Sequence, residues 1–212
     1  MKISLHRARF YGILDTAYVS LDDWTAKCAA LIGGGADIIQ LRAKKESHAE
    51  RVKLLEAILP LFEERPLPLI INDDIDLALL YPGLGLHVGQ DDLQAPEARD
   101  RLGPERILGL STHSIEQARE AIDLGATIDY FAIGPIFATA TKPDYPPVGL
   151  ELVRQVTAMQ PQTPLFCIGG INRQNALDIK AAGAQRLVAV SDVLCATDTA
   201  AAVRELKRIL ET

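Results

Sequence analysis

Short apolar runs recur along the chain, and the longer segments between them carry apolar residues at helical spacing. The runs are rich in β-branched and aromatic residues, which is typical of strands. In the segments between them the apolar stripe is one-sided, as with Trp24, Cys28 and Leu31. The pattern predicts eight strands, at residues 10–14, 38–41, 67–71, 84–88, 107–110, 130–133, 165–168 and 187–190.

Recognisable ends mark several of the predicted helices. Ser20 with Asp23, and Ser114 with Gln117, have the spacing of a capping box, which satisfies free N–H groups at a helix start. A glycine followed by alanine stands just before three of the strands, where a left-handed glycine ends a helix. These predicted helix stops are Gly35, Gly125 and Gly183.

Strict alternation of strands and helices determines the expected architecture. Right-handed crossovers between parallel strands favour an α/β fold, and eight units suggest closure into a (β/α)8 TIM barrel. A doubly wound open sheet is the alternative, but the turn at residues 15–19 holds no glycine and so lacks the dinucleotide-binding fingerprint. Because the chain has 212 residues, 48% of them hydrophobic, we expect one barrel domain over residues 1–212.

Charge and cysteine content narrow the expected partners and compartment. The net charge of −6 argues against a nucleic-acid partner. The three cysteines are far apart and lack the paired spacings of zinc sites, which favours free thiols in a reducing compartment. The N-terminus is polar and no stretch is long and apolar enough to span a bilayer, so we expect a cytoplasmic protein without a membrane partner. A homo-oligomer remains open.

One strand end carries a row of polar side chains. Gln40, Arg42 and Lys44 alternate at the end of the second predicted strand, so they share one face of it. An amide and two cations on one strand face are costly to bury without a partner. We expect that partner to be an anionic ligand, most simply a phosphate.

Acidic residues follow the next two strands. Asn72 and Asp73 come after the third strand and Asp92 after the fourth. Asn72 and Asp73 have a simpler interpretation as a helix N-cap. Capping does not explain both acidic turns beside two cations, whereas Mg²⁺ takes one or two carboxylates, waters and substrate phosphate oxygens. The pattern favours a metal-bound diphosphate.

A second phosphate site is predicted on the other side of the barrel. The stretch Gly169, Gly170, Ile171 and Asn172 follows the seventh strand, where a helix is expected to begin, and Ser191 follows the eighth. Backbone N–H groups and a helix N-terminus attract anions there, and barrels often build phosphate sites from these two loops. Two phosphate sites indicate two phosphorylated reactants.

The histidines carry less information. We predict structural or surface roles for His6, His48 and His87, and only His113, which follows the fifth strand beside Ser111, merits a test.

Six ordered motifs together resemble one known family. They lie at residues 40–44, 71–73, 87–92, 109–113, 134–142 and 169–171. Over residues 10–194 the chain resembles the thiamine phosphate synthase family, also called thiamine-phosphate pyrophosphorylase. It departs from the family at residues 84–87, where an acidic residue is usual, and its first strand is a loose match.

The resemblance implies a transferase that joins 4-amino-2-methyl-5-hydroxymethylpyrimidine diphosphate to hydroxyethylthiazole phosphate or its carboxylate. The products are thiamine phosphate and diphosphate. By the same resemblance Arg42, Lys44, Ser111 and Lys142 are catalytic. The implied ligands are Gln40, Arg42, Lys44, Asn72, Ser111 and Lys142 for the pyrimidine diphosphate, Thr139, Ala140, Thr141, Gly170, Val190 and Ser191 for the thiazole phosphate, and Asp73 and Asp92 for Mg²⁺.

The chemistry of that reaction fits the residues. A thiazole nitrogen attacks through a lone pair, so no general base is needed, and we expect a dissociative displacement under a lid at residues 137–149. One rival is the thiazole tautomerase branch of the superfamily, in which a histidine replaces Pro135. The other is a non-catalytic barrel that binds thiamine precursors.

Overall fold

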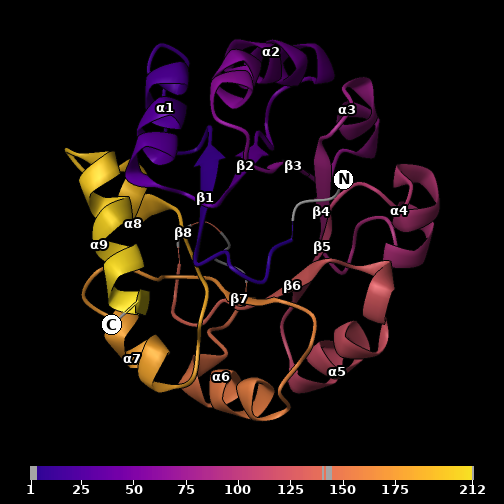
Figure 1. The fold of residues 1–212 in the computed structure, drawn as a ribbon, viewed down its shortest axis with the longest axis vertical. Helices are drawn as coiled ribbons and strands as arrows, with labels where there is room; N and C mark the ends of the chain where they lie inside the picture. The colour runs from indigo at the N-terminus through magenta and orange to yellow at the C-terminus, as the bar shows by residue number, and fades with distance from the viewer. Residues whose placement is uncertain (1–3, 140, 142–144, 212) are drawn as a thin grey trace.

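The fold is a closed barrel of eight parallel strands in chain order (Figure 1). The computed structural model describes residues 4–139, 141 and 145–211. Each described strand overlaps one of the predicted apolar runs, so the prediction of a TIM barrel is confirmed. The strands are β1 (Phe10–Asp15), β2 (Ile38–Arg42), β3 (Leu69–Asn72), β4 (Gly85–Val88), β5 (Leu108–Thr112), β6 (Tyr130–Ile133), β7 (Leu165–Cys167) and β8 (Leu187–Ala189).

Helices form a ring around the strands and cover the outer face of the barrel (Figure 1). None of those in the described ranges is long and apolar enough to cross a membrane. They are α1 (Trp24–Gly34), α2 (His48–Glu64), α3 (Ile75–Leu80), α4 (Ala95–Leu102), α5 (Ile115–Asp123), the 3-10 helix η1 (Gly125–Thr127), α6 (Gly149–Ala158), α7 (Ala176–Ala181), α8 (Ser191–Leu194) and α9 (Thr199–Glu211).

The predicted helix ends are largely present. The Ser114 hydroxyl accepts the N–H of Gln117 at the start of α5. Ser20 likewise accepts the N–H of Asp23, but α1 begins only at Trp24, one turn later than that pattern predicts. All three predicted glycine stops have positive φ, at Gly35, Gly125 and Gly183.

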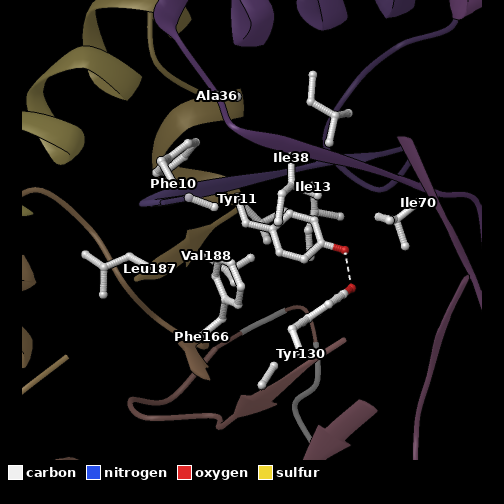
Figure 2. Packing of buried hydrophobic residues seen from close by; sticks show 14 of the residues in the cluster. Phe10, Tyr11, Ile13, Ala36, Ile38, Ile70, Tyr130, Phe166, Leu187 and Val188 are labelled. Carbon is white, nitrogen blue, oxygen red and sulfur yellow. Dashed lines mark hydrogen bonds between the residues drawn. The ribbon is translucent and has the colours of Figure 1, made fainter. Parts of the chain in front are cut away.

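Aromatic side chains fill the centre of the barrel below its mouth. Tyr11, Tyr130 and Phe166 pack edge to face, with ring centroids 5.4–5.7 Å apart (Figure 2). Gly109 is paired with Tyr130 on the neighbouring strand, and a Cβ atom at Gly109 would overlap the Tyr130 ring. A glycine in β5 therefore makes room for a large ring from β6.

All three cysteines are free. Cys28 and Cys167 are buried, whereas Cys195 is exposed. Burial raises the pKa of both buried thiols to about 12, so these two are protonated and unreactive near neutral pH.

Candidate active site

A cavity opens at the carboxyl ends of the strands, the end of the barrel where such folds carry their sites. Its volume is about 980 Å³, open solvent at the mouth included. Every predicted site residue within the described ranges lines it, while Ala140 and Lys142 lie outside those ranges. The predicted residues in the lining are Gln40, Arg42, Lys44, Asn72, Asp73, Asp92, Ser111, Thr139, Thr141, Gly170, Val190 and Ser191.

Each member of the polar row on β2 has a partner within the protein. Gln40 Nε2 donates to the hydroxyl of Tyr11 at 2.7 Å. Arg42 Nη1 lies 2.6 Å from Asp15 Oδ2, and Lys44 Nζ lies 2.8 Å from Asp73 Oδ2. A tyrosine and two carboxylates therefore already compensate this row, and the anionic ligand stays a prediction.

The two ion pairs differ in burial. The side chains of Arg42 and Asp15 are 12% and 1% exposed, whereas those of Lys44 and Asp73 are 49% and 23% exposed. An exposed pair contributes about 0–1 kcal/mol, so Lys44 can leave Asp73 at little cost. Arg42 is held in place by a carboxylate that has almost no contact with solvent.

The acidic residues at the ends of β3 and β4 face each other across the rim. Asp74, and not Asn72 or Asp73, caps α3 by accepting the N–H of Leu77, which removes the simpler interpretation of that pair. Asp73 has a φ of 61°, an uncommon conformation for a residue other than glycine. The structure thus uses a strained backbone position to turn a carboxylate toward the cavity.

The Asp92 carboxylate is held by the N–H of Gly89 at 2.7 Å. Loss of solvent raises the pKa of Asp92, and the nearby Asp73 carboxylate raises it further. Two carboxylates that repel each other at the edge of a cavity favour a bound cation. No group of three or more His, Cys, Asp or Glu side chains suited to a metal occurs in the described part of the chain. This donor set fits Mg²⁺, which binds through one or two carboxylates and takes its other ligands from water and phosphate.

The opposite rim is built from backbone and hydroxyl groups. Gly170 has a φ of 62°, and no described residue accepts a hydrogen bond from its N–H. The prediction that a helix begins at this stretch is wrong, because α7 begins only at Ala176. The Asn172 side chain accepts the N–H groups of Gln174 and Asn175 and folds the intervening loop instead. The site here has backbone N–H groups but no helix terminus at Gly170.

Hydroxyl groups complete this rim. The hydroxyl of Tyr18, in the loop after β1, lies 2.8 Å from Thr141 Oγ1. Thr139 Oγ1 accepts the N–H of Thr141 at 3.3 Å. The Tyr18 contact holds the loop after β6 against the loop after β1, and the Thr139 contact folds the loop after β6 on itself.

Several residues at the site were not predicted. Asp15 holds Arg42. Tyr11 and His87 line the cavity, Tyr130 bonds both of them, and His87 also bonds the hydroxyl of Ser111. The alternation that singled out Gln40 and Arg42 applies equally to Tyr11 and Asp15 in β1. Applied to every strand, it would have turned all of these side chains toward the barrel interior.

Fold and site together define a TIM-barrel protein whose mouth carries a charged rim and, opposite it, a rim of backbone and hydroxyl donors. The family model described as thiamine monophosphate synthase matches residues 10–193 of the chain. The chain belongs to the thiamine monophosphate synthase family.

Individual relatives agree with the family match. The thiamine-phosphate synthase of Roseiflexus sp. (strain RS-1) is 44% identical over 183 residues, which cover 86% of this chain and 76% of that protein. The thiamine-phosphate synthase of Acidothermus cellulolyticus is 39% identical over 205 residues, covering 97% and 96% of the two chains. The solved thiamine phosphate pyrophosphorylase of Pyrococcus furiosus superposes with a TM-score of 0.84 at 29% identity, over 96% of each chain. The family predicted from the sequence motifs, and with it a transferase of the thiamine-phosphate synthase type, is confirmed.

Proposed function

We propose that this chain condenses 4-amino-2-methyl-5-hydroxymethylpyrimidine diphosphate with hydroxyethylthiazole phosphate or its carboxylate, releasing diphosphate. One observation carries the proposal. A single cavity has Arg42, Lys44, Asp73 and Asp92 at one end and the Gly170 backbone with threonine hydroxyls at the other. Such a cavity suits two small phosphorylated molecules held with their reacting ends together.

Charge neutralisation at the leaving group is the main catalytic demand of this reaction. Arg42 and Lys44 face the end at which diphosphate would depart, and electrostatic stabilisation of such a group is commonly the largest catalytic contribution. The aminopyrimidine ring can delocalise the positive charge left on its methylene carbon. We therefore assign a largely dissociative displacement, with Gln40 and Ser111 orienting the ring.

A divalent cation is needed because the described side chains at this end carry more carboxylates than cations. Arg42 and Lys44 are each paired with a carboxylate, and Asp92 adds a further one. A diphosphate would meet no net positive charge from these described side chains. Asp73 and Asp92 would hold Mg²⁺, which when bound supplies positive charge to the diphosphate oxygens. Lys44 is then released to the diphosphate.

The thiazole phosphate would bind at the opposite rim. The Gly170 N–H, the Thr139 and Thr141 hydroxyls and Ser191 are donors suited to a phosphate. Pro135 stands where the tautomerase branch has a histidine and has no group that moves a proton. This favours condensation over tautomerisation.

The loop at residues 137–149 would exclude water from the reacting cation. Its described part is tied to the barrel, since the Val148 N–H donates to Pro135 and the Tyr145 ring lies 4.5 Å from that of His113. We propose this segment as the lid, with the predicted ligands Ala140 and Lys142 in it.

A two-substrate assay tests the proposal. The pyrimidine diphosphate and the thiazole phosphate are mixed with the protein and Mg²⁺, and thiamine phosphate and diphosphate are followed. We expect both products in equal amounts. Binding of both substrates without product would favour the non-catalytic barrel, and isomerisation of the thiazole carboxylate alone would favour the tautomerase.

The metal assignment has its own test in Asp92→Ala. We expect turnover to fall about 100-fold and the Mg²⁺ concentration needed for half activity to rise. Asp91→Ala is the matched control, because Asp91 is the adjacent carboxylate but its partner among the described residues is the Tyr145 hydroxyl, at 3.3 Å. An unchanged Mg²⁺ dependence in Asp92→Ala would remove Asp92 from the metal site.

A further inference from the structure

Five polar side chains form one continuous hydrogen-bonded chain beneath the cavity, from β2 to β5. Gln40 Nε2 donates to Tyr11 Oη at 2.7 Å, and the hydroxyls of Tyr11 and Tyr130 are 2.9 Å apart (Figure 2). Tyr130 Oη lies 2.9 Å from His87 Nδ1, and His87 Nε2 lies 2.8 Å from Ser111 Oγ. We call this chain the relay. Its two ends, Gln40 and Ser111, line the cavity, as do Tyr11 and His87 between them.

The relay has a preferred direction. Burial raises the pKa of both Tyr11 and Tyr130, so each hydroxyl keeps its single proton. Because the amide of Gln40 donates to Tyr11, the Tyr11 hydroxyl donates its hydrogen bond to Tyr130. The Tyr130 hydroxyl in turn donates to His87 Nδ1. The opposite direction between the two tyrosines would leave the buried Tyr11 proton without an acceptor among the described residues, which is unfavourable.

The direction determines what Ser111 presents to a ligand. An accepting Nδ1 requires the neutral tautomer of His87 with its proton on Nε2. The Nε2–H then donates a hydrogen bond to Ser111 Oγ. The hydroxyl proton of Ser111 is then left to donate into the cavity. Turning the Gln40 amide by 180° would reverse every bond, so that Gln40 would offer an N–H and Ser111 a lone pair. The hydrogen-bonding character of one end thus depends on that of the other.

We propose that the relay fixes the hydrogen-bond polarity of the cavity, with Gln40 Oε1 as acceptor and Ser111 as donor, and thereby selects an aminopyrimidine over an oxopyrimidine. Tyr11, Tyr130 and His87 are positioning residues in this scheme. An aminopyrimidine offers N–H donors on its amine and lone pairs on its ring nitrogens, which complement one acceptor and one donor. An oxopyrimidine reverses the pattern on the exocyclic group and the adjacent ring nitrogen. The substrate class, though not the relay itself, rests on the proposed function.

The tautomer of His87 tests the relay without any turnover. In the full chain labelled with ¹⁵N at histidine, we expect His87 to carry its proton on Nε2, with His87→Gln identifying its signals. Tyr11→Phe removes the hydroxyl that links Gln40 to Tyr130, so both tautomers should become populated. Tyr81→Phe removes a tyrosine hydroxyl that bonds Glu56 at the surface and should leave the tautomer unchanged. A wild-type His87 protonated on Nδ1 would overturn the proposal.

Substrate selectivity tests the second half. The measured quantity is the ratio of kcat/KM for the 4-amino pyrimidine diphosphate to that for its 4-oxo analogue. We expect Tyr130→Phe to lower this ratio about tenfold or more, with the KM for thiazole phosphate unchanged and Tyr81→Phe as control. Tyr11→Phe interrupts the relay at a different hydroxyl and should lower the same ratio. An unchanged ratio in both variants would overturn the proposal.

Failure of the proposed function can be told apart from failure of the relay. If the wild-type protein makes no thiamine phosphate, the condensation is wrong, whereas the His87 tautomer still reports on the relay. Selectivity is then read from the Kd values of the two pyrimidine diphosphates. Equal Kd values in the wild type would overturn the inference.

Discussion

The two ends of the cavity carry different kinds of polar groups. Among the described lining residues, the charged side chains Arg42, Lys44, Asp73 and Asp92 all lie at the β2–β4 end. The β6–β8 end offers backbone N–H and hydroxyl groups. Charged side chains suit a group whose charge changes during the reaction, because their interaction grows with that charge. Neutral donors hold a phosphate whose charge stays constant. The difference predicts that substitutions at the first end act on kcat and those at the second on KM.

Arg42→Met is expected to have the largest effect. It leaves Asp15, whose side chain is 1% exposed, as a buried carboxylate without its cation. Removing one partner of a buried pair costs about 3–5 kcal/mol, so the free energy of unfolding in urea should fall by that amount while kcat also drops.

The double variant Arg42→Met with Asp15→Asn separates the two effects. It removes the orphaned charge, so most of the stability should return while kcat stays low. A single variant as stable as the double one would show that Asp15 is not compensated by Arg42 in solution.

Lys44→Met should lower kcat about 100-fold with little loss of stability, because the Lys44 side chain is 49% exposed. Lys45→Met is the matched control, since Lys45 is the next residue and does not line the cavity. Steady-state kinetics with both substrates checks the prediction. A larger effect on the KM for thiazole phosphate than on kcat would mean that the two ends are exchanged.

The fold could be predicted almost completely from the sequence. The apolar runs identified every described strand because parallel strands buried on both faces have few polar residues. The boundaries differ at the carboxyl ends, where β1, β2, β3 and β5 continue into Asp15, Arg42, Asn72 and Thr112. There the backbone still pairs while the side chains face the site, so hydrophobicity alone ends these four strands too early.

The site could be predicted only in part. Family motifs located the lining residues, but not the partners that hold them, such as Asp15 for Arg42. The contact between Asp15 and Arg42 spans two strands, and it depends on the register of β1 against β2, which sets these two residues side by side. The prediction that a helix begins near Gly170 was wrong for a related reason. Asn172 and Asn175 bond local backbone groups, so the helix begins later in the chain.

Gly170→Ala should act mainly at the second end of the cavity. A Cβ atom there would lie 2.6 Å from the Ala138 carbonyl and 2.7 Å from Phe137 Cβ, so the loop that carries Thr139 must move. We expect the KM for thiazole phosphate to rise about tenfold with a small change in kcat. Gly125→Ala is the control for backbone strain, because Gly125 has a φ of 51° and no neighbour within 4 Å of such a Cβ. Equal KM effects in both variants would contradict a specific role for Gly170.

Tyr18→Phe should have the smallest effect and is the finest test of the comparison. The Tyr18 hydroxyl bonds Thr141 at 2.8 Å and orients that threonine without carrying charge. A hydrogen bond of this kind contributes about 1 kcal/mol, so the KM for thiazole phosphate should rise about fivefold while kcat and the pyrimidine KM stay constant. Thr141→Val removes the same bond, so the double variant should be no worse than Thr141→Val alone. A drop in kcat in Tyr18→Phe would contradict the proposed difference between the two ends. It would mean that a neutral donor beside the thiazole phosphate also affects the departure of diphosphate.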